Sequence, residues 1–123
     1  MKVRIKGNTL RYRLTKTEVA KLAAEGKVIE QVQFNEQTLS YQLVVSDLYP
    51  NLHASFNNNI ITIFFPSAKT IQWRDGEQVG HFFDMPIANQ QTMFLLVEKD
   101  FVCLDETHED QGDNYPNPLL NKK

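Results

Sequence analysis

Residues 1–14 read MKVRIKGNTLRYRL, and this stretch sets the pattern for the rest of the chain. Apolar and charged residues alternate on both sides of Gly7-Asn8, which predicts two strands of a β-hairpin joined by a two-residue turn. Such a turn pairs residues whose numbers sum to 15. One face of the hairpin is apolar and is expected in the core; it carries Val3, Ile5, Leu10 and Tyr12.

The other face of this hairpin is cationic. It carries Lys2, Arg4, Lys6, Arg11 and Arg13. The predicted register places Arg4 opposite Arg11 and Lys2 opposite Arg13, and like charges directly opposite one another destabilise a sheet. These five side chains are therefore the candidate anion-binding residues.

Four explanations of the cationic face stay open. Water and salt could screen the repulsion, or the chain's own carboxylates could neutralise it, with Glu30, Glu98 and the acidic segment 105–113 as candidates. A phosphorylated small molecule or polyphosphate could bind, because Arg side chains match phosphate oxygens. A nucleic-acid backbone is the fourth and is disfavoured, because the net charge is −2 and the face shows no exposed aromatic side chain for stacking bases.

Helix and strand signals alternate beyond the hairpin. Thr15 and Glu18 have the spacing of a capping box, and Gly26 suits a helix C-cap, so a helix is predicted at about 16–25. Strands are predicted at 28–34, 38–45, 52–57, 60–65, 78–84 and 92–99, with a short helix after Pro66 and an extended piece at 101–105. The aromatic side chains interpreted as core are Phe64, Phe65, Trp73, Phe82, Phe83 and Phe94.

The chain contains a weak internal repeat. A shift of 51 residues places Asn8 on Asn59 and Val28 on Val79, and a later shift of 54 requires a longer loop from Met85 to Gln90. We therefore predict one domain at 1–105 with pseudo-repeats 1–50 and 51–105, followed by an acidic tail at 106–123. The fold class is α+β, with about eight mostly antiparallel strands and two short helices in duplicated hairpin–helix–hairpin halves. A closed or partly closed barrel would remove the sheet edges, and a two-layer sheet is the alternative.

Composition excludes several classes of protein. The 123 residues suit one globular domain. No stretch approaches the length of a membrane span. The single cysteine, Cys103, suggests a reducing compartment, so we expect a cytoplasmic protein. The segment from Cys103 through His108 to Asp113 has poor spacing for zinc or calcium, so no metal site is predicted. No nucleotide-binding or hydrolase motif is present, and no cofactor is expected.

Two resemblances bear on the function. The opening KVRIKGNTLRYRLTKTEV and the closing LVEKDFVCLD and EDQGDNYPNPL resemble a family of short bacterial proteins of unknown function, over nearly the whole chain. More distantly, the architecture and the Arg4, Arg11 and Arg13 face are similar to the CYTH, or triphosphate-tunnel, fold. That resemblance implies an eight-stranded barrel that binds triphosphates. The metal-holding E-x-E-x-K of that fold is replaced here by K-V-R-I-K, so the resemblance implies anion binding and not metal-dependent catalysis.

The sequence does not establish what the protein does or whether it is an enzyme. The leading hypothesis is a binding domain whose cationic face takes a phosphorylated small molecule or polyphosphate. One alternative is a Mg²⁺-dependent tunnel-type phosphohydrolase in which Glu30 and Glu98 hold the metal, which requires both carboxylates near the cations. The other is a protein-interaction module with outward cations and an apolar patch elsewhere.

Overall fold

The fold is α+β, and the computed structural model of the chain describes residues 1–101 and 113–116. The elements, in chain order, are β1 (Lys2–Lys6), β2 (Thr9–Leu14), α1 (Lys16–Glu25), β3 (Lys27–Gln33), β4 (Thr38–Ser46), β5 (His53–Asn57), β6 (Ile60–Pro66), a 3₁₀ turn (Ser67–Lys69), α2 (Thr70–Asp75), β7 (Gly80–Ile87) and β8 (Gln91–Lys99). Each of these strands and helices was predicted from the sequence to within a few residues. Among the described helices, none has the length and apolar character that crossing a bilayer requires.

The first hairpin and α1 have the local structure that the sequence predicts. Strands β1 and β2 pair antiparallel around Gly7, whose φ of 56° lies in the left-handed region that glycine adopts easily. Helix α1 begins with a complete capping box between Thr15 and Glu18, and it ends at Gly26 with φ 78°. Both ends of α1 are therefore satisfied by residues next to it in the chain.

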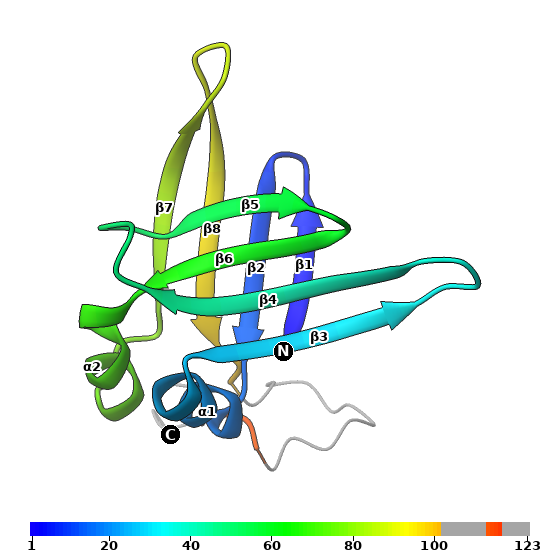
Figure 1. The fold of residues 1–123 in the computed structure, drawn as a ribbon. Coiled ribbons are helices and arrows are strands. Elements are labelled where there is room, and N and C mark those ends of the chain that lie inside the picture. The colour runs from blue at the N-terminus through cyan, green and yellow to red at the C-terminus, as the bar shows by residue number, and fades with distance from the viewer. Residues whose placement is uncertain (102–112, 117–123) are drawn as a thin grey trace.

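The eight strands form two four-stranded mixed sheets, whose strands run across each other in two layers (Figure 1). Sheet A has the order β1-β2-β8-β7 and sheet B the order β3-β4-β6-β5. The four hairpins are antiparallel, whereas the central strands pair in parallel, β2 with β8 and β4 with β6. No ladder joins the two sheets in the described residues, so the closed barrel is not confirmed and each sheet keeps its edges. The fold is the two-layer alternative.

The hydrophobic core lies between the sheets and reaches the two helices at one end of the molecule. Alternate residues of the strands point inward, and α1 adds Val19 and Leu22 while α2 adds Trp73. The Tyr12 hydroxyl crosses the interface and donates to the carbonyl oxygen of Ile61 at 3.0 Å. Packing thus occupies most of the inner face of each sheet.

The hairpin β7–β8 is longer than predicted. We expected a loop from Met85 to Gln90, but β7 continues to Ile87 and the turn is formed by Asn89 and Gln90, both with positive φ. Pro86 lies within β7 and pairs with Thr92. The prediction was wrong because β7 is an edge strand, where the missing N–H of a proline is tolerated.

A short piece of the C-terminal tail packs on the domain. The carbonyl oxygen of Asp113 accepts from the Lys16 amide at 3.1 Å, and its carboxylate accepts from the Thr17 hydroxyl at 2.9 Å. Hydrogen bonds from Thr15 and Thr17 lower the pKa of Asp113. The Tyr115 amide donates to the carbonyl oxygen of Asp100 at 2.7 Å. Residues 113–116 therefore lie against the start of α1 and the end of β8.

Of the predicted extended piece at 101–105, the structure describes Phe101 alone, which forms a parallel bridge with Tyr115. Cys103, His108 and the acidic segment up to residue 112 lie outside the described residues. Lys99, at the end of β8, is buried and donates to the carbonyl oxygen of Gly76 at 2.9 Å, and its Nζ lies 4.9 Å from the centroid of the Tyr115 ring.

We expect an acid-sensitive stability from His81, on the inner face of β7. Its ring meets Phe65 and Trp73 edge-on, and burial, with Lys69 and Lys99 nearby, lowers its pKa from 6.5 to about 4. A lowered pKa means that the unfolded chain takes up a proton which the folded chain does not. Through His81, the free energy of unfolding is therefore constant above about pH 6.5 and decreases as the pH is lowered from about 6.5 to about 4.

Chemical denaturation at several pH values checks this expectation. The loss is at most about 1.4 kcal/mol for each pH unit in that window, and it is smaller than this limit because the ring is partly exposed. The variant His81→Leu should lack this part of the pH dependence, whereas His53→Leu, which removes a histidine stacked on Tyr49, should retain it. Equal pH dependence in the wild type and His81→Leu would contradict the assignment.

Candidate functional site

The cationic face is the outer face of sheet A over β1 and β2, and it comprises Lys2, Arg4, Lys6, Arg11 and Arg13. The predicted register is confirmed, with Arg4 opposite Arg11 and Lys2 opposite Arg13. Their neighbours in the strands, such as Val3 and Tyr12, point into the core. The cations therefore point away from the core, toward solvent.

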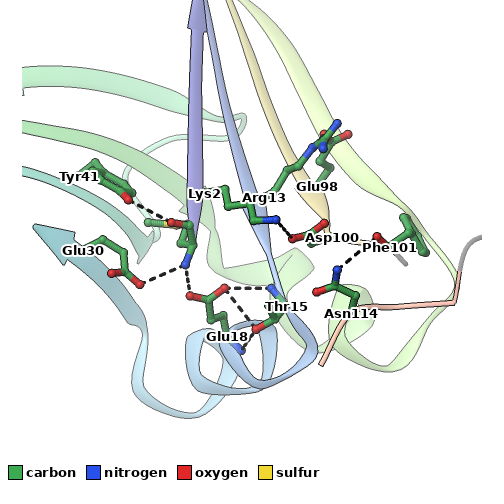
Figure 2. Close-up of polar contacts among 11 residues, drawn as sticks. Lys2, Arg13, Thr15, Glu18, Glu30, Tyr41, Glu98, Asp100, Phe101 and Asn114 are labelled. Carbon is green, nitrogen blue, oxygen red and sulfur yellow. Dashed lines mark hydrogen bonds and ion pairs between the residues drawn. The ribbon is translucent and has the colours of Figure 1, made fainter. Parts of the chain in front are cut away.

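Glu98 neutralises part of this face. Neutralisation by the chain's own carboxylates was one of the four explanations of the cationic face. It lies opposite Arg13 in the parallel ladder between β2 and β8. A single carboxylate oxygen of Glu98 accepts from Arg11 Nη2 at 2.7 Å and from Arg13 Nε at 2.6 Å. At the end of the sheet, Lys2 Nζ lies 3.3 Å from a carboxylate oxygen of Asp100 (Figure 2).

The remaining donors of the face are not neutralised in this way. Within residues 1–101 and 113–116, Arg4 and Lys6 make no ion pair, and the buried Nε of Arg11 has no hydrogen-bond partner. Two shallow depressions of about 250 Å³ each lie between these side chains, and both are lined by Arg4 and Arg11. Each is smaller than the cavities of about 300–1,000 Å³ that enclose drug-sized ligands. The face suits the phosphate groups of a ligand better than an enclosed molecule.

Aromatic side chains share this outer surface, and here the sequence interpretation was wrong. Phe82 and Phe94 were expected in the core, yet Phe82 is 69% exposed and Phe94 is half-buried. Their ring centroids lie 6.0 Å apart with an interplanar angle of 28°. The ladders place Leu96 between Arg11 and Phe82. Cations over β1 and β2 therefore adjoin apolar rings over β8 and β7.

A family model for a family of unknown function, DUF7009, matches residues 1–119, which is nearly the whole chain. The chain belongs to this family. No curated protein and no solved structure matches the sequence. Membership confirms the expected family of unknown function, while the bacterial origin and the relation to the triphosphate-tunnel fold stay predictions.

The DUF7009 chain does not bring the two candidate acids together. Glu30 lies on β3 in sheet B, where its carboxylate is 3.1 Å from the terminal ammonium of Met1, and Glu18 binds the same ammonium group. Burial, followed by the charges of Glu30 and Glu18, raises the pKa of the adjacent Tyr41. Figure 2 shows Glu30 well apart from Glu98. Glu30 and Glu98 thus do not form the carboxylate pair that the hydrolase alternative requires, and the described residues contain no cluster of three metal-binding side chains.

An apolar cleft of about 390 Å³ lies elsewhere on the DUF7009 chain, between the turn of β1–β2, strand β5 and the hairpin β7–β8. Ile5 and Phe56 are largely exposed there. Its lining also includes Met85, Ile87 and Met93. The lining contains no charged residue, so the cleft is distinct from the cationic face.

Proposed function

We propose that the outer face of sheet A binds a phosphate-bearing anion, of the class of phosphorylated small molecules and polyphosphate. The observation that supports this proposal is the arrangement of the five cations. Two pairs lie directly opposite one another on an exposed surface, an arrangement that destabilises a sheet unless an anion is near. Glu98 and Asp100 form ion pairs with Arg11, Arg13 and Lys2. Arg4 and Lys6 form none within the described residues and are left for an external anion.

The geometry of the arginines also favours phosphate. Glu98 occupies Nη2 of Arg11 and Nε of Arg13, and Arg11 Nε is buried. Nη1 of Arg11 and both Nη atoms of Arg13 make no hydrogen bond within the described residues and are the nitrogens left for a ligand. Hydrogen bonds between guanidinium groups and phosphate oxygens are charge-assisted and among the stronger ones in proteins.

The double variant Arg4→Gln/Arg11→Gln should bind tripolyphosphate at least about tenfold more weakly than the wild type. A hydrogen bond to a charged group contributes about 1.5–3 kcal/mol, and part of this is lost to solvent screening on an open face. Isothermal titration calorimetry at fixed ionic strength, with and without Mg²⁺, measures the affinity. The unfolding free energy of the double variant should change little, because removal of the opposed pair Arg4–Arg11 is offset by loss of the hydrogen bond from Arg11 to Glu98.

A second double variant, Lys21→Gln/Lys27→Gln, is the matched control. It removes two exposed cations from α1 and β3 and thus changes the net charge equally. We expect an affinity within about twofold of the wild type, since both groups lie outside the cationic face. Equal weakening by the two double variants would mean that net charge, and not the cationic face, determines binding.

The protein-interaction alternative predicted outward cations and an apolar patch elsewhere, and the apolar cleft at Ile5 and Phe56 agrees with it. If tripolyphosphate does not bind in these titrations, the cleft becomes the leading candidate surface. No observation favours the hydrolase alternative, because Glu30 binds the terminal ammonium of Met1 and Glu98 binds two arginines.

A further inference from the structure

The parallel pairing of β2 with β8 creates a composite surface that neither hairpin has alone. One row across sheet A runs from Arg4 through Arg11 and Leu96 to Phe82. The next row runs from Lys6 through Thr9 and Phe94 to Asp84. The first row therefore begins with two cations and the second with one, and each row reaches an aromatic ring within the same sheet.

The distances across these rows are short. Neighbouring strands lie about 4.8 Å apart, so the backbone of β7 lies about 10 Å from that of β2. Adjacent nucleotides of a single strand can span such a distance, with phosphates near Arg11 and bases near Phe82. The surface carries two small, open depressions of about 250 Å³ each, which suit a strand lying along it more than a small molecule enclosed by it.

We infer that this surface binds single-stranded nucleic acid, with phosphates on the cationic face and bases stacked on Phe82 and Phe94. The inference rests on the proposed function, because the same cations bind phosphate groups, and it extends that function to a polymeric ligand. Exposed aromatic rings beside a positively charged groove are the two components of sequence-tolerant single-strand binding. Four-stranded sheets that stack bases on surface aromatics are an established way of recognising single strands.

Charge complementarity supports a polyanion on this surface although the whole chain is weakly acidic. Five cations on the face compare with three carboxylates, those of Asp84, Glu98 and Asp100, which leaves an excess of two positive charges among the described residues (5 − 3 = 2). A duplex fits less well, because its bases are stacked inside and cannot reach the rings on β7 and β8. The sequence argued against nucleic acid because it indicated no exposed aromatic side chain on this face. The exposed ring of Phe82 removes that objection.

Fluorescence anisotropy with labelled oligo-dT, oligo-U and a duplex of equal length tests the inference. We expect the single strands to bind more tightly than the duplex, and Phe82→Ala to weaken single-strand binding about tenfold or more through loss of stacking. Phe82→Tyr should restore binding, because it restores the ring. Phe34→Ala is the matched control, since Phe34 is also a well-exposed phenylalanine, 58% exposed, but follows β3 in sheet B.

Salt dependence separates the two parts of the surface. For single strands the slope of log affinity against log salt is about −0.7 for each phosphate contact. Arg4→Gln/Arg11→Gln should therefore make the slope shallower by about 1.4, whereas Phe82→Ala should lower the affinity and leave the slope nearly unchanged.

Tripolyphosphate titrated into the same variants distinguishes this inference from the proposed function. If Phe82→Ala leaves oligonucleotide binding unchanged, or if the duplex binds as tightly as the single strands, the inference is overturned. Continued loss of tripolyphosphate binding in Arg4→Gln/Arg11→Gln would then leave the proposed function intact. If neither oligonucleotides nor tripolyphosphate binds to the wild type, both are overturned.

Discussion

Replacing Trp73 with alanine is expected to lower the free energy of unfolding by about 3–5 kcal/mol, the range for large aromatic residues in cores. Trp73 is fully buried, and its ring stacks on Phe65 at 5.2 Å and meets His81 at 5.7 Å. It anchors α2, which has only six residues and little stability of its own. The loss is a large fraction of the 5–15 kcal/mol typical of such domains.

Urea denaturation followed by far-UV circular dichroism measures this effect, since Trp73 is the only tryptophan and fluorescence is lost with it. Ile71→Ala is the matched control on the same helix, because Ile71 is 51% exposed, and it should change stability by about 0.5 kcal/mol or less. Trp73→Phe should cost less than Trp73→Ala, because it keeps a ring and removes an indole N–H that has no partner among the described residues. Equal destabilisation by Ile71→Ala would contradict this account of α2.

Replacing Glu98 with glutamine should lower stability and raise affinity for anions together. Glu98 is only 14% exposed and accepts from both Arg11 and Arg13. Loss of its charge weakens two hydrogen bonds to charged groups, with an expected cost of about 1–3 kcal/mol. It also removes the internal competitor for both guanidinium groups, so tripolyphosphate should bind about tenfold more tightly.

Unfolding in urea with and without saturating tripolyphosphate tests this trade-off. The anion should restore more stability to Glu98→Gln than to the wild type, because a ligand bound only by the native state stabilises it by mass action. Asp84→Asn makes the same charge change on the same face without an arginine contact in the described part of the chain, and its effects should be small. Weaker tripolyphosphate binding by Glu98→Gln would show that Glu98 positions the arginines and does not compete with the ligand.

Local features were predictable because the residues that determine them are neighbours in the chain. The turn at Gly7-Asn8 fixes the register of the first hairpin, and with it the opposed pairs Arg4–Arg11 and Lys2–Arg13. Thr15, Glu18 and Gly26 determine where α1 begins and ends. These signals depend on turn and cap chemistry, which acts over a few residues.

The pairing of distant strands was not predictable in the same way. Nothing near β2 indicates that Arg13 will lie opposite Glu98, because the two strands are far apart in the chain and no short turn joins them. The exposed rings had a detectable signal that the core interpretation overlooked. Phe82 and Phe83 are adjacent in a strand, so strict alternation places one of them outside, and the same rule places Phe94 outside when Leu95 is buried.

The exchange of hairpins between the two sheets has a consequence for how the chain folds. Each half of the chain contributes one hairpin to each sheet, and β2 meets β8 where Thr9 pairs with Phe94, 85 residues later (94 − 9 = 85). Protein synthesis adds about 5–20 residues per second, so the first hairpin waits roughly 4–17 s for its partner strand. Contacts this distant in the chain slow folding. Completion of sheet A is therefore controlled by the arrival of its last strand, and until then Arg11 and Arg13 lack the carboxylate of Glu98 and hold a concentrated positive charge on the nascent chain.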